Sequence, residues 1–199
     1  MSFVEELAAA EIGATFNFYR EGQQRAGLLR RRLDDYLAAL KHARFLLVGE
    51  APGYRGARVS GVPFTSERQL TGTGPAEATA TIVRATLAAL ELEDETLCWN
   101  VVPTHPGSAS SNRPPTRTEI EAGVRFAGRL ARRRIVIAVG RVAAAAMDAE
   151  YVRHPSHGGA EAFRDGLLRF ATGGRPVRHF HAKNLERKAR RDRAPLVRG

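Results

Sequence analysis

The fold of this chain is first indicated by the stretch Arg44-Phe45-Leu46-Leu47-Val48-Gly49-Glu50-Ala51-Pro52-Gly53. Its first half is a short apolar run typical of a buried strand, and its second half breaks at once into glycine and proline. Similar runs lie at 96–102 and 135–139, with a weaker one at 150–153. Because segments with helical spacing separate these runs, we expect right-handed crossovers between parallel strands. The predicted fold is a single-domain α/β three-layer sandwich with a mostly parallel four-stranded central sheet.

Between the strands, apolar residues recur at three- and four-residue spacing, which indicates helices. Helices are predicted at about 4–40 and 75–90, from the capping signal Thr116-Arg117-Thr118-Glu119 to about 131, as a short element at Gly140-Arg141-Val142-Ala143, and at about 160–172. The connections at 49–75 and 103–118 are long and rich in small and turn-forming residues, and such loops in compact domains are usually functional. We assign residues 1–172 to one domain and residues 173–199 to a basic C-terminal tail, which we expect to be partly disordered because it has few apolar residues.

Composition restricts the class of protein. The chain has 199 residues, which suits one domain with a sizeable core. No apolar run approaches the ~18–20 residues of a membrane span, and Met1-Ser2-Phe3-Val4-Glu5-Glu6 lacks the features of a secretory signal. The single cysteine, Cys98, excludes an internal disulfide, and the histidines are too scattered for a zinc site. We therefore expect a cytoplasmic protein of bacterial type without metal.

The charge of the chain is strongly positive. The net charge is +10 and the isoelectric point is near 10.9. Such an excess favours polyanionic partners and salt-sensitive binding that does not depend on base sequence. Arginine in a composition rich in alanine and arginine also serves solubility, so the charge by itself leaves both explanations open.

Polar residues follow several of the predicted strands directly. Glu50, Asn100, Gly140 and His154 each stand just after an apolar run. Ligands of parallel α/β sheets bind at the carboxyl ends of the strands. These four positions are therefore expected to meet at one edge of the sheet and to form a binding site there.

Four short motifs follow one another between Arg44 and Phe170. They are Gly49-Glu50-Ala51-Pro52-Gly53, Phe64 within Gly61-Val62-Pro63-Phe64-Thr65, Asn100 after its strand, and His154-Pro155-Ser156. In this order and spacing they resemble the uracil-DNA glycosylase superfamily. The resemblance implies a DNA-repair enzyme that hydrolyses the N-glycosidic bond of uracil in DNA and leaves an abasic site. It favours the branch with Gly-Glu-Ala-Pro-Gly, but that branch commonly holds an iron–sulfur cluster on four cysteines, and one cysteine cannot bind such a cluster.

The resemblance also implies roles for individual residues. His154 would donate a hydrogen bond to uracil O2 while negative charge builds on the leaving base. Asn100 would accept from uracil N3 and donate to O4, a pattern that rejects cytosine. Phe64, on what we expect to be an exposed loop, would stack on the base beside Gly49 and Gly53. Each of the three side chains also has an ordinary explanation, as a loop histidine, a turn residue or a core aromatic.

The sequence offers Glu50 as a candidate for the group that activates water. The best-known branch has an aspartate at the position of Ala51, where it positions the attacking water. Alanine provides no such group, so Glu50 is the nearest candidate to orient water. Glu50 has an alternative role as a carboxylate that only supports the pocket, and Ala51 itself would line the base.

DNA contacts are expected around the base pocket. Turns from strands into helices present free N–H groups to phosphates, and His157 is expected on the loop that enters the DNA after base flipping. The predicted DNA-binding residues are Thr65, Ser66, Gly140, Arg141, Arg153, Ser156, His157 and Gly158. The expected partner is DNA containing uracil, bound by a monomer without cofactor. Two alternatives stay open, a glycosylase for hypoxanthine or xanthine and a non-catalytic protein that binds abasic or single-stranded DNA.

Overall fold

The central sheet consists of four parallel strands in the order β2-β1-β3-β4. The computed structural model describes residues 1–173, so the predicted basic tail lies outside the described residues except for Gly173. The strands are β1 Phe45–Gly49, β2 Thr96–Asn100, β3 Ile135–Val139 and the short β4 Tyr151–Val152. The prediction of an α/β fold with a four-stranded sheet is confirmed, and every strand pair is parallel.

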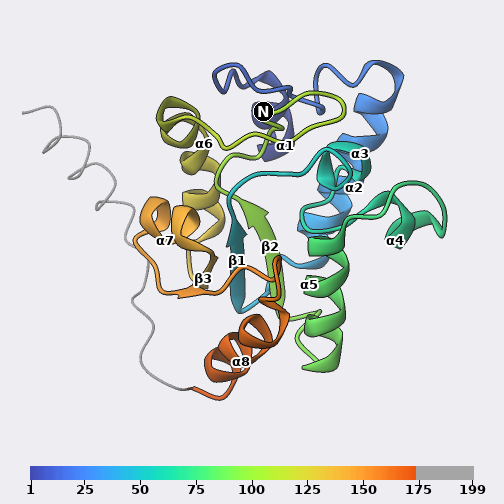
Figure 1. Ribbon diagram of the computed structural model, residues 1–199. Coiled ribbons are helices and arrows are strands. Elements are labelled where there is room, and N and C mark those ends of the chain that lie inside the picture. The colour runs from blue at the N-terminus through green and yellow to red at the C-terminus, as the bar shows by residue number, and fades with distance from the viewer. Residues whose placement is uncertain (174–199) are drawn as a thin grey trace, which may run out of the picture.

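Strand side chains alternate between two apolar layers. In β1, Leu46 and Val48 pack on one face, whereas Phe45 and Leu47 pack on the other. Both faces are covered by helices, which makes three layers (Figure 1). The first face is covered by α1 Phe3–Ala9, α2 Ala26–Ala39, α6 Arg117–Leu130 and α7 Arg141–Met147. The second face is covered by α5 Ala78–Ala89 and α8 Ala160–Ala171.

The predicted helix from 4 to 40 is wrong as one continuous element. Helix α1 ends at Ala9, and α2 begins only after a short turn of helix, η1 Gln23–Arg25. The buried side chain of Asn17 donates to the carbonyl oxygens of Leu7, Ala8 and Ala10 and so satisfies the end of α1. Apolar spacing continues on both sides of this break, and for that reason the sequence pattern predicts a single helix.

Two further boundaries differ from the predictions. The connection 49–75 is not without structure, since it contains the short helices α3 Ala57–Ser60 and α4 Glu67–Thr71. Helix α5 begins at Ala78 rather than at Pro75, whose carbonyl instead accepts from the backbone of Arg68. The start of α6 is as predicted, because Thr116 and Glu119 form a reciprocal capping box.

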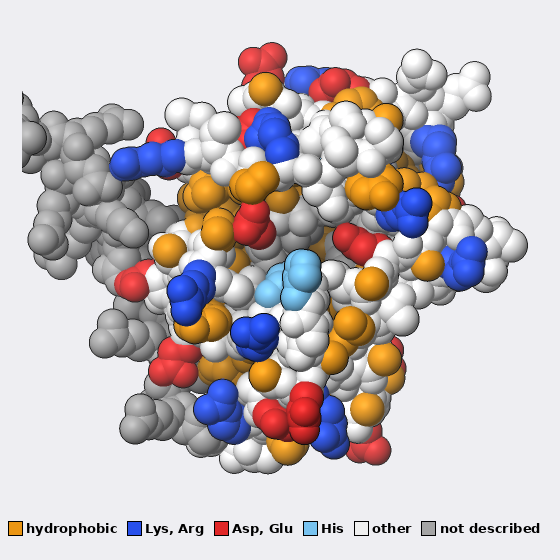
Figure 2. Space-filling model, in the orientation of Figure 1, with side chains coloured by type: hydrophobic (Ala, Val, Ile, Leu, Met, Phe, Trp, Pro, Cys, Tyr) orange, Lys and Arg blue, Asp and Glu red, His pale blue; other side chains and the backbone are white. Residues whose placement is uncertain are grey.

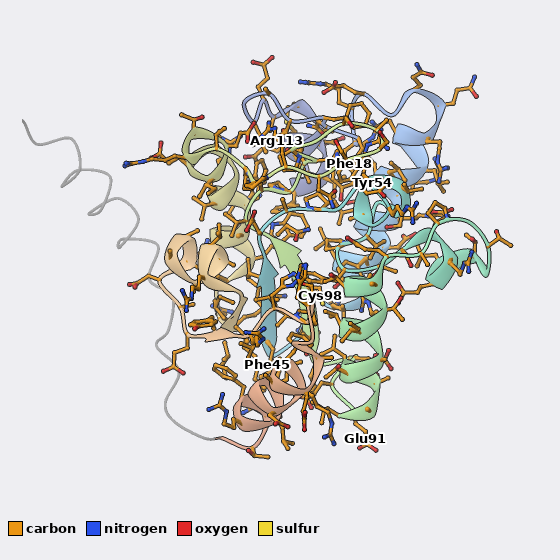
Figure 3. The ribbon with its side chains drawn as sticks, in the orientation of Figure 1. Phe18, Phe45, Tyr54, Glu91, Cys98 and Arg113 are labelled. Atoms are coloured by element: carbon orange, nitrogen blue, oxygen red, sulfur yellow. The ribbon has the colours of Figure 1, made fainter. Side chains whose placement is uncertain are left out.

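An ion pair anchors the long connection between β2 and α6. Arg113 binds the carboxylate of Glu119, with 2.6 Å between Nη2 and Oε1, and the Glu119 side chain is only 1% exposed. The guanidinium holds the pKa of the Glu119 carboxyl at about 2. Figure 3 shows Arg113 and Tyr54 in the loops at one end of the sheet, while Phe45 lies at the other end. The ion pair thereby ties the connection between β2 and α6 to the first turn of α6.

No helix among residues 1–173 is both long and apolar enough to cross a membrane.

Candidate functional site

The carboxyl ends of β1 and β2 bring three of the predicted residues together. Gly49 and Asn100 are register partners at the ends of these strands. A Cβ atom at Gly49 would collide with the ring of Phe64 and would lie 3.0 Å from Asn100 Oδ1. Only glycine therefore lets the aromatic ring and the amide approach each other at this point.

The amide of Asn100 has no protein partner. The residue is only 5% exposed, yet its side chain forms no hydrogen bond within residues 1–173. The nitrogen Nε1 of Trp99 is sealed from solvent and has no partner. The two polar atoms of the Asn100 side chain, in contrast, still reach solvent. Buried side-chain amides are normally hydrogen-bonded. The Asn100 amide is thus fixed by packing and remains available to a ligand.

Phe64 is held in a strained backbone conformation. Its φ of +51° lies in the left-handed region that non-glycine residues rarely adopt. Arg84 from α5 donates to the carbonyl oxygens of Pro63 and Phe64, and the hydroxyl of Ser60 donates to the carbonyl of Thr65. Such strain costs about 1–3 kcal/mol and persists where surrounding contacts impose it, often at functional sites.

The loop that carries Phe64 is not exposed, contrary to the prediction. Residues 61–66 are all buried, because the Arg84 and Ser60 contacts satisfy their backbone. Thr65 and Ser66, which were predicted to contact DNA, have their polar groups occupied within the protein. The Thr65 hydroxyl donates to Pro63, and both the backbone N–H and the hydroxyl of Ser66 bind Gln69. These two residues offer no free donor to a phosphate in this structure.

His154 is half-buried at the end of β4, next to the end of β3. A Cβ at Gly140 would lie 3.8 Å from the Cβ of His154, which is ordinary contact. The backbone N–H of Ser156 donates to His154 Nδ1 at 3.2 Å, and the Ser156 hydroxyl lies 2.8 Å from the same nitrogen. Since Nδ1 accepts, the neutral ring carries its proton on Nε2.

Electrostatics favour the neutral form of this ring. Burial lowers the pKa of His154, and the neighbouring His157 lowers it further. Nε2 has no partner within residues 1–173, so its N–H is available to a ligand. The site thus presents a neutral imidazole as a hydrogen-bond donor.

The remaining predicted DNA-binding residues surround His154. Arg141, Arg153, His157 and Gly158 are exposed, and Gly140 and Ser156 are half-buried. His157 and Gly158 have φ of 53° and 73°, so the chain turns sharply here. Figure 2 shows a histidine surface beside a hollow, with acidic and basic side chains around it. The positions suit contact with a large ligand, and the DNA contacts themselves stay predictions.

The first motif places a carboxylate at the same edge. Glu50 is half-buried, and its carbonyl accepts from Val102 N–H, which extends the pairing of β1 and β2. Burial raises the pKa of its carboxyl, and no hydrogen bond or ion pair to this carboxyl exists among the described residues. Ala51 packs against the core, whereas Gly53 lies under the carboxylate of Glu77.

Two residues that the sequence did not single out also shape this edge. Glu77 approaches the first motif from the start of α5. His105 is 1% exposed, with Nδ1 2.8 Å from the carbonyl oxygen of Pro52 and Nε2 2.8 Å from that of Ser108. His105 therefore ties the first motif to the loop after β2 and has no nitrogen left for a ligand. Neither role leaves a local signal in the sequence, because both depend on contacts between distant segments.

The described residues contain no group of three or more His, Cys, Asp or Glu side chains that could hold a metal ion.

Comparison with known proteins agrees with this architecture. A model of the uracil DNA glycosylase superfamily matches residues 37–192, so the chain belongs to this superfamily. Membership supports a DNA glycosylase, a hydrolase that acts on DNA. The crystal structure of wild-type Pedobacter heparinus SMUG2 is similar in fold, with a TM-score of 0.59, 12% identity, and coverage of 87% of this chain and 98% of that chain. No curated protein matches the sequence significantly.

Proposed function

We propose that this protein excises uracil from DNA by hydrolysis of the N-glycosidic bond and leaves an abasic site. The observation that carries the proposal is the Asn100 amide, which is buried, fixed beside the Phe64 ring and without a protein partner. A fixed amide beside an aromatic ring matches a flat base that presents both a donor and an acceptor. The base would be flipped out of the DNA to reach this pocket.

Discrimination between bases follows from the same amide. Uracil offers a donor at N3 and an acceptor at O4, and Asn100 can satisfy both with its oxygen and its NH₂ group. Cytosine reverses the two groups and would leave buried polar atoms unpaired, which strongly disfavours binding. Stacking on Phe64 would add about 1–3 kcal/mol without distinguishing the bases.

Rate acceleration would come mainly from electrostatics. When the bond from the sugar to the base breaks, negative charge develops on the base and positive charge on the sugar. A neutral His154 that donates through Nε2 would stabilise the first of these charges at uracil O2. The half-buried carboxylates at this edge would stabilise the second.

The test is incubation of the purified full chain with a uracil-containing oligonucleotide, followed by cleavage of abasic sites with alkali. We expect strand cleavage at the uracil position and none in the matched oligonucleotide with cytosine. Parallel oligonucleotides with hypoxanthine or xanthine test the wider substrate range. Tight binding without cleavage of any of them would favour a non-catalytic DNA-binding protein instead.

A further inference from the structure

Glu77 lies at the N-cap position of α5, but it does not cap this helix. Its backbone is extended, with φ −119° and ψ 126°, and its side chain forms no hydrogen bond with the first turn. The carboxylate lies instead against the loop that follows β1. A Cβ atom at Gly53 would collide with Glu77 Oε1, and one at Gly56 would collide with Oε2. The loop thus has glycine at both positions where this carboxylate lies.

The carboxylate of Glu77 differs from other shielded carboxylates of the chain. Glu67 is paired with Arg32, with 2.8 Å between Oε2 and Nη1, and Glu119 is paired with Arg113. Glu77 has no hydrogen bond or ion pair within residues 1–173. Burial raises the pKa of its carboxyl, and no neighbouring charge contributes to this shift. Ionisable groups that are desolvated in this way gather at functional sites.

The position of Glu77 connects it with the proposed pocket. Gly53 closes the motif that begins at Gly49, the glycine on which Phe64 and Asn100 converge. Glu50 and Glu77 are the two half-buried carboxylates without a partner among the described residues, and Glu77 lies against the loop that follows Glu50.

We propose that Glu77 is a catalytic carboxylate that holds the attacking water and faces the sugar of the flipped nucleotide. This inference rests on the proposed function. The C1′–N1 bond breaks and its electron pair passes to N1 of the base, while the water oxygen forms a bond to C1′. The proton released by water passes to the Glu77 carboxylate and from there to solvent. Glu77 thus fills the role for which Ala51 has no group.

The test compares single-turnover excision of uracil by the full chain and by Glu77→Gln, Glu77→Ala and Glu50→Gln. Glu95→Gln is the matched control, because it removes the same charge from an exposed side chain at the opposite end of β2. We expect Glu77→Gln to lower the rate constant by about 10²-fold or more. The dissociation constant for DNA should not rise, since a negative charge is lost. Glu95→Gln should behave as the unchanged chain.

Chemical rescue separates catalysis from folding. Formate added to Glu77→Ala should restore part of the lost rate, because a small carboxylate can occupy the space of the deleted one. The proposal is supported if formate restores activity to Glu77→Ala and if Glu50→Gln loses less of the excision rate than Glu77→Gln does. It is overturned if Glu77→Gln keeps the full excision rate. It is also overturned if Glu50→Gln loses more of that rate than Glu77→Gln and formate does not rescue Glu77→Ala. Either of these last two results would leave the proposed function intact. An unchanged chain that excises no base would overturn both.

Discussion

His105 and His154 lie beyond the carboxyl ends of strands in the same sheet, but their rings are bound in different ways. Both nitrogens of the His105 ring lie at hydrogen-bond distance from backbone carbonyl oxygens. His154 is bound only at Nδ1, by Ser156, and its Nε2 is left without a protein partner. The first histidine is suited to holding two loops together, and the second is suited to binding a ligand.

The same distinction applies to other polar side chains of the protein. Asn17, Ser66 and Glu119 are buried and fully occupied by protein groups, so they stabilise the fold. Asn100 and Glu77 are shielded but unpartnered. Because unpaired buried polar groups lower stability, their presence at one edge indicates a site that a ligand completes. Occupied and unoccupied groups should therefore differ in function.

The largest effect is expected for His154→Ala. Loss of one donor to a developing negative charge lowers turnover by about 10²–10³-fold. The dissociation constant for uracil-containing DNA should stay nearly unchanged, since this hydrogen bond strengthens mainly in the transition state. Single-turnover kinetics and fluorescence anisotropy measure the two quantities. Equal losses in binding and in turnover would contradict the assigned role.

Asn100→Asp should alter which base is accepted. A carboxylate cannot donate to uracil O4, so uracil excision should fall by about 10²-fold, in line with the penalty for an unpaired buried group. Excision of cytosine should become detectable, because the new side chain can accept from the 4-amino group. Paired oligonucleotides with uracil or cytosine measure this ratio. If both rates equal those of the unchanged chain, Asn100 does not read the base.

Phe64→Ala should have a smaller effect on both binding and rate. Loss of a stacking surface worth about 1–3 kcal/mol corresponds to roughly a 5- to 150-fold loss in kcat/KM, divided between KM and kcat. The apparent KM should rise and kcat should fall together, as the ring both holds and orients the base. Phe64→Tyr, which keeps the ring, is the matched control. An effect on thermal stability alone would make Phe64 a packing residue.

His105→Asn should affect stability rather than chemistry. The shorter side chain cannot reach the carbonyls on both sides, and each buried group left unpaired costs about 1–3 kcal/mol. We expect a lower Tm, while the turnover of the folded fraction changes less than that of any variant above. Loss of turnover with an unchanged Tm would show that His105 contributes to the reaction, and would contradict its assignment as a residue that only stabilises the fold.

The smallest expected difference concerns protonation of His154. Its pKa is lowered from the ordinary value of 6.5, so at pH 6.5 more than half of the rings should be neutral, and the charged form should appear only as the pH falls further. Nitrogen chemical shifts from NMR should show the proton on Nε2 at this pH. A ring that is mostly charged at pH 6.5, or protonated on Nδ1 when neutral, would contradict the hydrogen bond from Ser156.

Much of this architecture could be predicted from local pattern. Apolar runs identified the strands, and the rule for parallel sheets placed Glu50, Asn100, Gly140 and His154 at one edge. The register of Gly49 with Asn100 agrees with that placement. These features follow from residues that are close together in the sequence, where spacing alone carries the information.

The features that could not be predicted depend on distant segments. The break after α1 depends on a side chain, Asn17, that reaches back to three carbonyl oxygens. The burial of Phe64 depends on Arg84 from α5, and the position of Glu77 depends on two glycines in another loop. Gly53 and Gly56 were visible in the sequence, but their spacing does not reveal which carboxylate lies against them.

The unpartnered groups at this edge are proposed to form a pocket in which water replaces uracil on the sugar. Mass spectrometry of a uracil-containing oligonucleotide after incubation with the full chain measures both products of that reaction. We expect free uracil together with an oligonucleotide whose mass has changed by loss of the base and gain of one hydroxyl at the abasic site. An oligonucleotide that is bound but keeps its full mass, with no uracil released, would contradict this proposal.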